Sequence, residues 1–416
     1  MTTPKPFKIA VDDSLLAFVN QRVATGRIPE GYNFPPGKEW TYGVPSQEMS
    51  RLKEYWTHKY DWRAVEARIN SYLKMFTIPI EHNGESFSMH FVHHRSEKEG
   101  AVPMLFQHGW PGSFLEVEPI IDSLVNPSDP SHQAYHIIAP SLPGFGFSSS
   151  SKSPDFTLID IAAINNKIML ALGYTKYIVQ GGDWGSMVSR FAAVGHSDNV
   201  LACHVNMIVA TPPVWYTQPI SFVRFVVWAI MNAKKPGSML AKMLWWRKDE
   251  NGYLEIQGTK PQTLTYALAD SPLGQLAWIR DKMQPLISND YRWQDEDVIT
   301  WAMMYIIPGS TGSSAIYTNG KGKKAKIFQQ VLLDKPLPAK QDFGASVFPD
   351  DVFNVPYFWA SACVSKNIVF WKEHAVGGHF ASTEKPVELV EDIREFTKNI
   401  RKENMTALKQ SGKLKL

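Results

Sequence analysis

The chain has 416 residues, of which 44% are hydrophobic and 20% are charged. This balance excludes a disordered chain, because it supplies enough apolar surface for a sizeable core. The 43 basic residues nearly match the 40 acidic ones, so the net charge of +3 gives no electrostatic reason to expect a nucleic-acid partner. The two cysteines, Cys203 and Cys363, are too few for a disulfide framework, and both lie in apolar runs that are typical of buried strands.

The N-terminal region lacks the apolar segment of a secretory signal, and no run of residues is long and apolar enough for a membrane-spanning helix. We therefore predict a soluble, cytoplasmic protein without a membrane anchor. Residues 1–100 combine short amphipathic helices with loops, and their apolar positions are too numerous for a free linker. We expect this segment to wrap the core of the protein and to brace the rest of the chain.

Short apolar runs then alternate with helical segments, which is typical of a mostly parallel sheet in an α/β fold. The alternation stops at Pro212-Pro213, and residues 213–330 are aromatic and helical. We therefore predict a core formed by residues 101–212 and 331–416, with residues 213–330 as a helical cap. The expected strands are 89–92, 102–106, 135–139, 177–179, 357–363 and 368–371, and the expected helices include 161–172 and 386–400.

The most informative stretch is Gly181-Gly182-Asp183-Trp184-Gly185, which lies between a predicted strand and a predicted helix. Glycines at a strand-to-helix turn allow the strained conformation of a nucleophile elbow, and here Asp183 takes the nucleophile position. A carboxylate is ionised at neutral pH and attacks a saturated carbon without a base, which leaves an ester. The pattern favours displacement at an epoxide or a carbon–halogen bond. Taken alone, it would also fit an aspartate that caps a helix.

A second signal follows the predicted strand 102–106, where His108-Gly109-Trp110-Pro111-Gly112 forms a turn. In this position a backbone N–H can stabilise an oxyanion, and we assign that role to Trp110. The N–H of Trp184, directly after the nucleophile, is the second expected donor. An ordinary glycine–proline turn is the alternative interpretation.

A third signal is Gly377-Gly378-His379-Phe380, which lies between the last predicted strand and the closing helix. Asp350 and Asp351 lie upstream, so that the chain order is nucleophile, acid, histidine. Adjacent residues of an extended segment point to opposite sides, and only one of the two carboxylates can reach His379. We choose Asp351 as the acid.

Together these motifs resemble epoxide hydrolases of the α/β-hydrolase fold, in the branch close to the microsomal enzymes. The resemblance spans nearly the whole chain. It implies a cap with two tyrosines that donate hydrogen bonds to the epoxide oxygen; the matching residues are Tyr253 and Tyr317, with Tyr305 as the alternative to Tyr317. The motifs that carry the resemblance are Tyr60-Asp61-Trp62-Arg63, Glu66-Ala67-Arg68-Ile69-Asn70, His108-Gly109-Trp110-Pro111-Gly112, Ser141-Leu142-Pro143-Gly144-Phe145-Gly146-Phe147-Ser148, Gly181-Gly182-Asp183-Trp184-Gly185 and Gly377-Gly378-His379-Phe380.

We thus expect an epoxide hydrolase that converts apolar epoxides and water into vicinal diols through an ester on Asp183. No metal-ligand spacing and no phosphate-binding glycine loop is present in the sequence, so no metal and no cofactor is expected. A homodimer is a possible assembly, and detoxification is one role among several. The alternatives are a dehalogenase with the same triad, in which indole N–H groups bind halide, and a catalytically silent ligand receptor.

Overall fold

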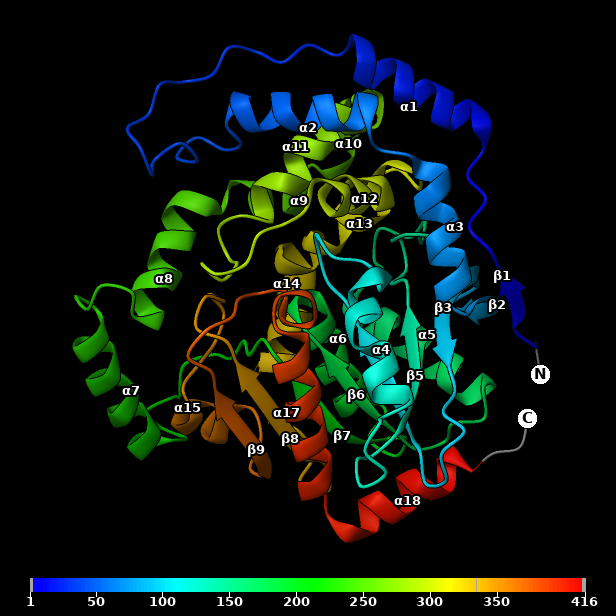
Figure 1. Ribbon diagram of the computed structural model, residues 1–416. Coiled ribbons are helices and arrows are strands. Elements are labelled where there is room, and N and C mark those ends of the chain that lie inside the picture. The colour runs from blue at the N-terminus through cyan, green and yellow to red at the C-terminus, as the bar shows by residue number, and fades with distance from the viewer. Residues whose placement is uncertain (1–2, 334, 414–416) are drawn as a thin grey trace.

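The computed structural model describes residues 3–333 and 335–413. A nine-stranded sheet with the order β1-β2-β3-β5-β4-β6-β7-β8-β9 forms its centre (Figure 1). The strands from β5 to β9 pair in parallel, whereas β1, β2, β3 and β5 pair antiparallel. The strands are β1 (Lys5–Phe7), β2 (Met75–His82), β3 (Glu85–His94), β4 (Val102–Gln107), β5 (Tyr135–Pro140), β6 (Tyr177–Gly181), β7 (Val200–Val205), β8 (Asp342–Val347) and β9 (Ile368–Glu373).

Helices cover both faces of the sheet, as parallel strands require. In Figure 1, α4 and α17 lie in front of the sheet, and α5 and α6 lie behind it. The predicted α/β architecture is confirmed. The helical elements of this core are η1 (Phe114–Val117), α4 (Glu118–Val125), α5 (Leu158–Ala171), α6 (Asp183–Gly195), α15 (Tyr357–Cys363), α16 (Ala381–Glu384), α17 (Pro386–Asn399) and α18 (Lys402–Gly412).

A helical insertion between β7 and β8 forms the cap, which lies over the loops that follow β4 and β6 (Figure 1). Its first helix, α7, begins at Pro219. The elements of the cap are α7 (Pro219–Asn232), α8 (Met239–Trp245), η2 (Trp246–Glu250), α9 (Gly252–Thr259), α10 (Pro261–Asp270), α11 (Pro272–Lys282), α12 (Asp295–Ile306), α13 (Thr311–Ala315), η3 (Ile316–Gly320), α14 (Gly322–Phe328) and η4 (Gln329–Leu333).

The N-terminal segment contributes to both the sheet and the cap. Its helices α1 (Asp13–Thr25) and α2 (Ser46–His58) lie along α11 and α12 at the top of Figure 1, while α3 (Trp62–Tyr72) descends toward the sheet. Ion pairs join α1 to Asp270 and α2 to Asp295 and Arg280. The expectation of helices and loops was incomplete here, because β1, β2 and β3 extend the sheet along its antiparallel edge.

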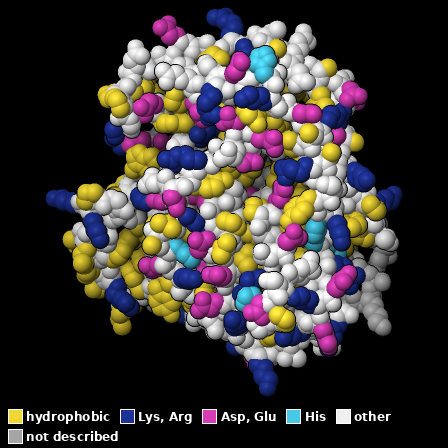
Figure 2. All heavy atoms as spheres, in the orientation of Figure 1, with side chains coloured by type: hydrophobic (Ala, Val, Ile, Leu, Met, Phe, Trp, Pro, Cys, Tyr) yellow, Lys and Arg dark blue, Asp and Glu magenta, His cyan; other side chains and the backbone are white. Residues whose placement is uncertain are grey.

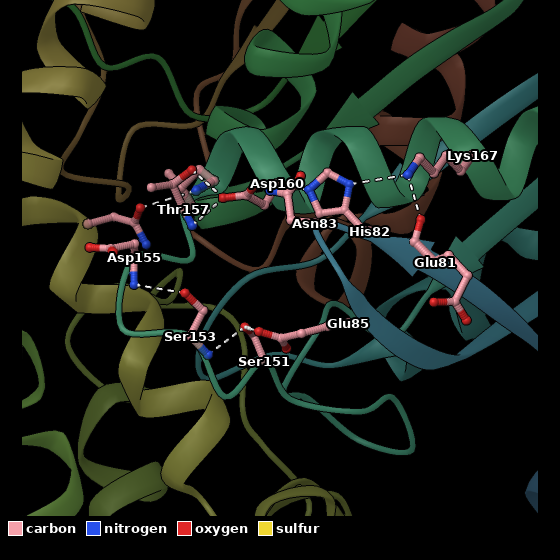
Figure 3. A network of polar contacts seen from close by, with 12 residues as sticks. Glu81, His82, Asn83, Glu85, Ser151, Ser153, Asp155, Thr157, Asp160 and Lys167 are labelled. Atoms are coloured by element: carbon pink, nitrogen blue, oxygen red, sulfur yellow. Dashed lines mark hydrogen bonds and ion pairs between the residues drawn. The ribbon is translucent and has the colours of Figure 1, made fainter.

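The turn between β2 and β3 is held against α5 by a network of polar contacts, shown in Figure 3. Asp160 accepts hydrogen bonds from Thr157 at the start of α5, from Asn83, and from the His82 ring at 2.8 Å. Lys167 donates to the carbonyl oxygen of Glu81 at 2.6 Å. The same carboxylate therefore caps the helix and fixes the hairpin, which attaches the N-terminal strands to the core.

One predicted strand is wrong. Residues 357–363 form the helix α15, and Cys363 therefore lies in a helix, whereas Cys203 lies in β7 as predicted. The aromatic composition suggested a strand, but Pro356 stands at the N-cap and Trp359 packs against Phe225 of the cap. Tertiary packing has overridden the local preference.

Candidate active site

Asp183 lies at the turn from β6 to α6, with a backbone conformation that residues other than glycine rarely adopt. Its φ of +47° is in the left-handed region, which is unusual for a residue other than glycine. The turn is close-packed: a Cβ on Gly185 would lie 1.9 Å from the carbonyl oxygen of Gln107, and one on Gly181 would lie 2.5 Å from Gly185. Gly181 and Gly185 are therefore required because the backbone approaches closely at both positions. The strained residue between them, Asp183, is thereby positioned at the end of β6.

The loop after β4 provides a hydrogen-bond donor to this carboxylate. The backbone N–H of Trp110 donates to Asp183 Oδ1 at 2.7 Å. A Cβ on Gly109 would lie 2.1 Å from the same oxygen, so only glycine allows this approach. Trp184 is the second residue of α6, and its N–H has no partner within the helix. Both expected oxyanion donors thus belong to residues next to the carboxylate.

His379 lies between two carboxylates. Its Nε2 is 3.4 Å from Asp183 Oδ2, and its Nδ1 is 3.2 Å from Asp351 Oδ1. The Asp351 side chain is fully buried. Asp350 points elsewhere and accepts a hydrogen bond from Lys242 at 2.7 Å. The structure therefore brings Asp351, and not Asp350, against the histidine.

The two carboxylates control the charge of the histidine. Burial lowers the pKa of His379, but the charges of Asp351 and Asp183 outweigh burial and raise that pKa well above its ordinary value. The two carboxylates therefore favour the protonated, imidazolium form of His379.

The loop that carries His379 is attached to the cap through a buried carboxylate that the sequence interpretation missed. Glu384 accepts hydrogen bonds from the backbone N–H groups of Ser288, at 2.6 Å, and of Phe380, at 2.9 Å. The N–H of His379 also donates to the carbonyl oxygen of Leu286 at 2.8 Å. Burial raises the pKa of Glu384 to about 7. The cap segment at residues 286–288 thus fixes the backbone of the histidine loop.

Two tyrosines of the cap lie next to the donor loop. The ring of Tyr253 stacks on the ring of Trp110 with centroids 5.0 Å apart, and Tyr317 packs edge-on against Trp184 at the same distance. Tyr317 is buried and Tyr253 is partly buried, and burial raises the pKa of each phenol above its ordinary value. The buried hydroxyl of Tyr317 has no hydrogen-bond partner among the described residues. By contrast, Tyr305 donates to the carbonyl oxygen of Gly112 at 2.6 Å.

A cavity of about 150 Å³ opens in front of Asp183. Tyr253 lines it together with side chains that are almost all apolar, which favours an apolar ligand. The other lining residues are Trp184, Met187, Met207, Val209, Leu254, Gly320, Phe328 and Phe353.

A second buried carboxyl group that the sequence interpretation missed belongs to Glu116, at the start of the segment after the donor loop. Burial raises the pKa of Glu116 to about 8, and the charge of Asp183 acts in the same direction, whereas the charge of His379 opposes it. Its carboxyl oxygen occupies the space that a side chain at Gly112 would fill. An acidic residue flanked by Phe114, Leu115 and Val117 was the available signal.

Within residues 3–333 and 335–413, no group of three or more His, Cys, Asp or Glu side chains is arranged to hold a metal ion. The same part of the chain contains no helix with the length and apolar character needed to cross a bilayer.

Comparison with known proteins places this geometry in a family. Residues 4–117 match the model of the epoxide hydrolase N terminus, and residues 102–230 match that of the alpha/beta hydrolase fold. The solved structure of Aspergillus niger epoxide hydrolase is 30% identical and superposes with a TM-score of 0.81, over 96% of this chain and 97% of the other. The chain belongs to the epoxide hydrolase family.

Two further members of the epoxide hydrolase family are similar over almost the same span. Epoxide hydrolase 1 of Oryctolagus cuniculus is 29% identical over 94% of this chain and 88% of its own length. The structure of juvenile hormone epoxide hydrolase from the silkworm Bombyx mori is 26% identical, with a TM-score of 0.82 over 97% of this chain and 96% of that one. The resemblance read from the motifs is confirmed.

Proposed function

We propose that this epoxide hydrolase opens apolar epoxides by attack of Asp183 on a ring carbon and then hydrolyses the resulting ester to a vicinal diol. The observation that carries the proposal is the environment of one carboxylate. Asp183 has a backbone N–H on one oxygen, an imidazole near the other, and in front of it an apolar cavity that is lined by the phenol of Tyr253.

In the first step, an Asp183 oxygen forms a bond to an epoxide carbon while the bond from that carbon to the ring oxygen breaks. The alkoxide that develops is a strong base, and a donor must stabilise it. Tyr253 and Tyr317 are the proposed donors, because Tyr253 packs against Trp110 and Tyr317 packs against Trp184. Their raised pKa values keep them protonated, so that they can donate at neutral pH.

In the second step, His379 takes a proton from the water that attacks the ester carbonyl. Formation of the ester removes the negative charge of Asp183, which is one of the charges that raise the pKa of His379. The imidazolium therefore gives up its proton to solvent more readily after the first step, and the neutral imidazole becomes available as a base. The alkoxide of the opened epoxide takes up a proton in exchange and becomes the first hydroxyl group. We assign Asp351 to holding the imidazolium, and the N–H groups of Trp110 and Trp184 to holding the tetrahedral oxyanion. When that intermediate collapses, the bond from the carboxyl carbon to the alkyl oxygen breaks, and the imidazolium returns its proton to the departing oxygen. This restores the Asp183 carboxylate and releases the diol.

The dehalogenase alternative uses the same carboxylate, but a halide leaving group requires no proton donor. Two cap phenols, Tyr253 beside Trp110 and Tyr317 beside Trp184, favour the epoxide as substrate. A cytoplasmic location is proposed on the reduced state of Cys203 and Cys363, which are both buried and unpaired. We also propose that the protein assembles as a homodimer. Measurement of its mass in solution tests this assembly.

The direct test is product analysis with styrene oxide and 1-bromobutane as parallel substrates. We expect diol from the epoxide and no bromide release. Asp183→Asn, which preserves shape, should abolish diol release. Bromide release by the unaltered protein without diol formation would overturn the proposal in favour of dehalogenation.

A further inference from the structure

Helix α7 has an apolar face that the fold leaves uncovered. It buries no residue, although most of its residues are hydrophobic. The exposed fractions of Ile220, Val223, Ile230 and Met231 are 77%, 60%, 72% and 71%. Their spacing places them along one side of the helix. The opposite side is used for packing, because Phe225 contacts Trp359 of α15 with ring centroids 4.9 Å apart.

The exposed surface continues on both sides of α7. Trp215 and Tyr216 precede the helix with exposed fractions of 66% and 70%, and Leu244 and Trp245 of α8 are 52% and 38% exposed. Figure 2 shows the hydrophobic side chains gathered at the lower left, where Figure 1 places α7, with Lys and Arg side chains at their margin. We refer to residues 214–248 as the α7–α8 surface. A contiguous apolar patch of this kind marks an interaction site.

The charge of this surface has a single sign. No Asp or Glu occurs from residue 199 to residue 248. Of the cations, Lys242 is paired with Asp350 across the cap–core boundary, and Lys248 lies 3.8 Å from Asp249, the residue that directly follows this surface. The cations in the α7–α8 surface are Arg224, Lys234, Lys235, Lys242, Arg247 and Lys248.

We propose that the α7–α8 surface docks on a membrane surface that contains anionic lipid. Apolar side chains on one face, Trp and Tyr beside them, and Lys or Arg without acidic residues are the combination that binds a helix in the lipid headgroup region. Anionic headgroups are complementary to these cations. A second copy of the chain in the same position would bring like charges together, which opposes self-association through this surface.

The surface is connected to the cavity by the chain itself. α8 continues directly into Trp246. The centroid of its ring lies 4.5 Å from that of Phe353 and 6.0 Å from that of Tyr253. Phe353 and Tyr253 both line the cavity in front of Asp183. An apolar epoxide dissolved in lipid would therefore meet the protein close to the site. The docking itself does not depend on the proposed hydrolysis, because exposed apolar and cationic side chains alone carry it.

Cosedimentation of the full-length protein with vesicles tests the proposal. We expect binding to phosphatidylcholine vesicles that contain about one-third phosphatidylserine, and weaker binding to phosphatidylcholine alone. The triple variant Val223→Gln, Val227→Gln, Ile230→Gln should bind at least about tenfold more weakly, because it removes apolar groups from the docking face. The matched control Ile159→Gln, Leu170→Gln, Val387→Gln changes three exposed apolar residues on α5 and α17, and it should bind as the unaltered protein does.

A second variant separates charge from apolar contact. Lys234→Glu with Lys235→Glu should weaken binding to the anionic vesicles and leave the weak binding to phosphatidylcholine unchanged. Measurement of the protein's mass in solution tests the alternative that a second copy of the chain covers this surface. The proposal is overturned if the unaltered protein does not bind anionic vesicles, or if the triple variant binds them equally well. It is also overturned if the protein is a dimer without lipid and the triple variant is a monomer. Diol formation in lipid-free solution is measured separately, so that failure of docking and failure of catalysis are distinguishable.

Discussion

The two halves of the active site are built in different ways. The core half consists of Asp183, Trp110, Asp351 and His379, which all lie shortly after strands of one sheet. The cap half consists of Tyr253 and Tyr317, which lie on helical elements of an insertion. Backbone geometry fixes the core half, as the close approach of Gly185 to Gln107 illustrates. Ring packing against Trp110 and Trp184 fixes the cap half. If the two halves act in successive steps, a substitution in one half should slow one step and leave the rate of the other step nearly unchanged.

The largest separation is expected within the core half, between Asp351 and its neighbour. Asp351→Ala removes the carboxylate 3.2 Å from His379 and should slow ester hydrolysis by at least about a thousandfold, because the imidazolium loses its partner. Asp350→Ala removes only the pair with Lys242 and should change the rate little. Single-turnover measurements of ester decay distinguish the two, and equal effects would mean that Asp351 has no special role.

In the cap half, Tyr253→Phe and Tyr317→Phe should each slow ester formation by about a hundredfold, the effect of losing one oxyanion donor. Ester decay should stay nearly unchanged. Tyr305→Phe is the matched control, because that hydroxyl donates to the backbone of Gly112 and is therefore expected to leave ester formation unaltered. Rapid-quench measurement of ester accumulation gives the rates. If both single variants form the ester at the wild-type rate, the two tyrosines contribute only to packing.

The buried carboxyl of Glu116 should make stability depend on pH. Its pKa is raised from 4.5 to about 8, so the stability it contributes is present at low pH and is lost as the pH rises through that interval. Glu116→Gln stays neutral and should gain roughly 1–3 kcal/mol of unfolding free energy relative to the unaltered protein between pH 5 and pH 8.5. Urea unfolding at both pH values measures the difference. A constant difference would show that Glu116 is already ionised at pH 5.

The smallest effect is expected at the contact between the N-terminal segment and the cap. We propose that the N-terminal segment braces the cap. Glu48 accepts a hydrogen bond from the mostly buried Arg280 of α11 at 2.9 Å. Glu48→Gln should cost about 1–2 kcal/mol, because it leaves that guanidinium without its counter-charge. Breaking the exposed pair between Lys340 and Asp198 by Asp198→Asn is the control, and no measurable change is expected. Equal stability of both variants would argue against bracing through this contact.

The same difference between the halves explains what the sequence could predict. Asp183 and His379 were found because glycines lie next to them in the sequence, and those glycines are needed where other backbone segments approach closely. The choice between Tyr305 and Tyr317 could not be made locally, because it depends on which hydroxyl the fold directs to the carbonyl oxygen of Gly112. Glu116 and Glu384 were missed for a related reason: a carboxyl group becomes unusual only when distant segments bury it.

Besides the short β1, the strands β2 and β8 were missed, and composition explains both. β8 contains Gly344 and Ser346 where larger apolar residues would have indicated a strand. A Cβ on Gly344 would lie 2.4 Å from the ring of Phe396, so the close packing of α17 requires a small residue there. β2 was missed because Pro79 and Glu81 interrupt its apolar pattern, which is tolerated near the antiparallel edge of the sheet. In both cases the neighbouring elements, not the strand itself, determine the residues.

The central claim is that the Asp183 carboxylate forms a covalent ester, and the variant His379→Gln tests it most directly. Attack by an ionised carboxylate needs no base, whereas hydrolysis of the ester does. After mixing with styrene oxide, intact-protein mass spectrometry should show the variant plus one substrate mass, and peptide mapping should place the added mass on Asp183. Steady turnover by this variant, or an adduct on another residue, would contradict the account.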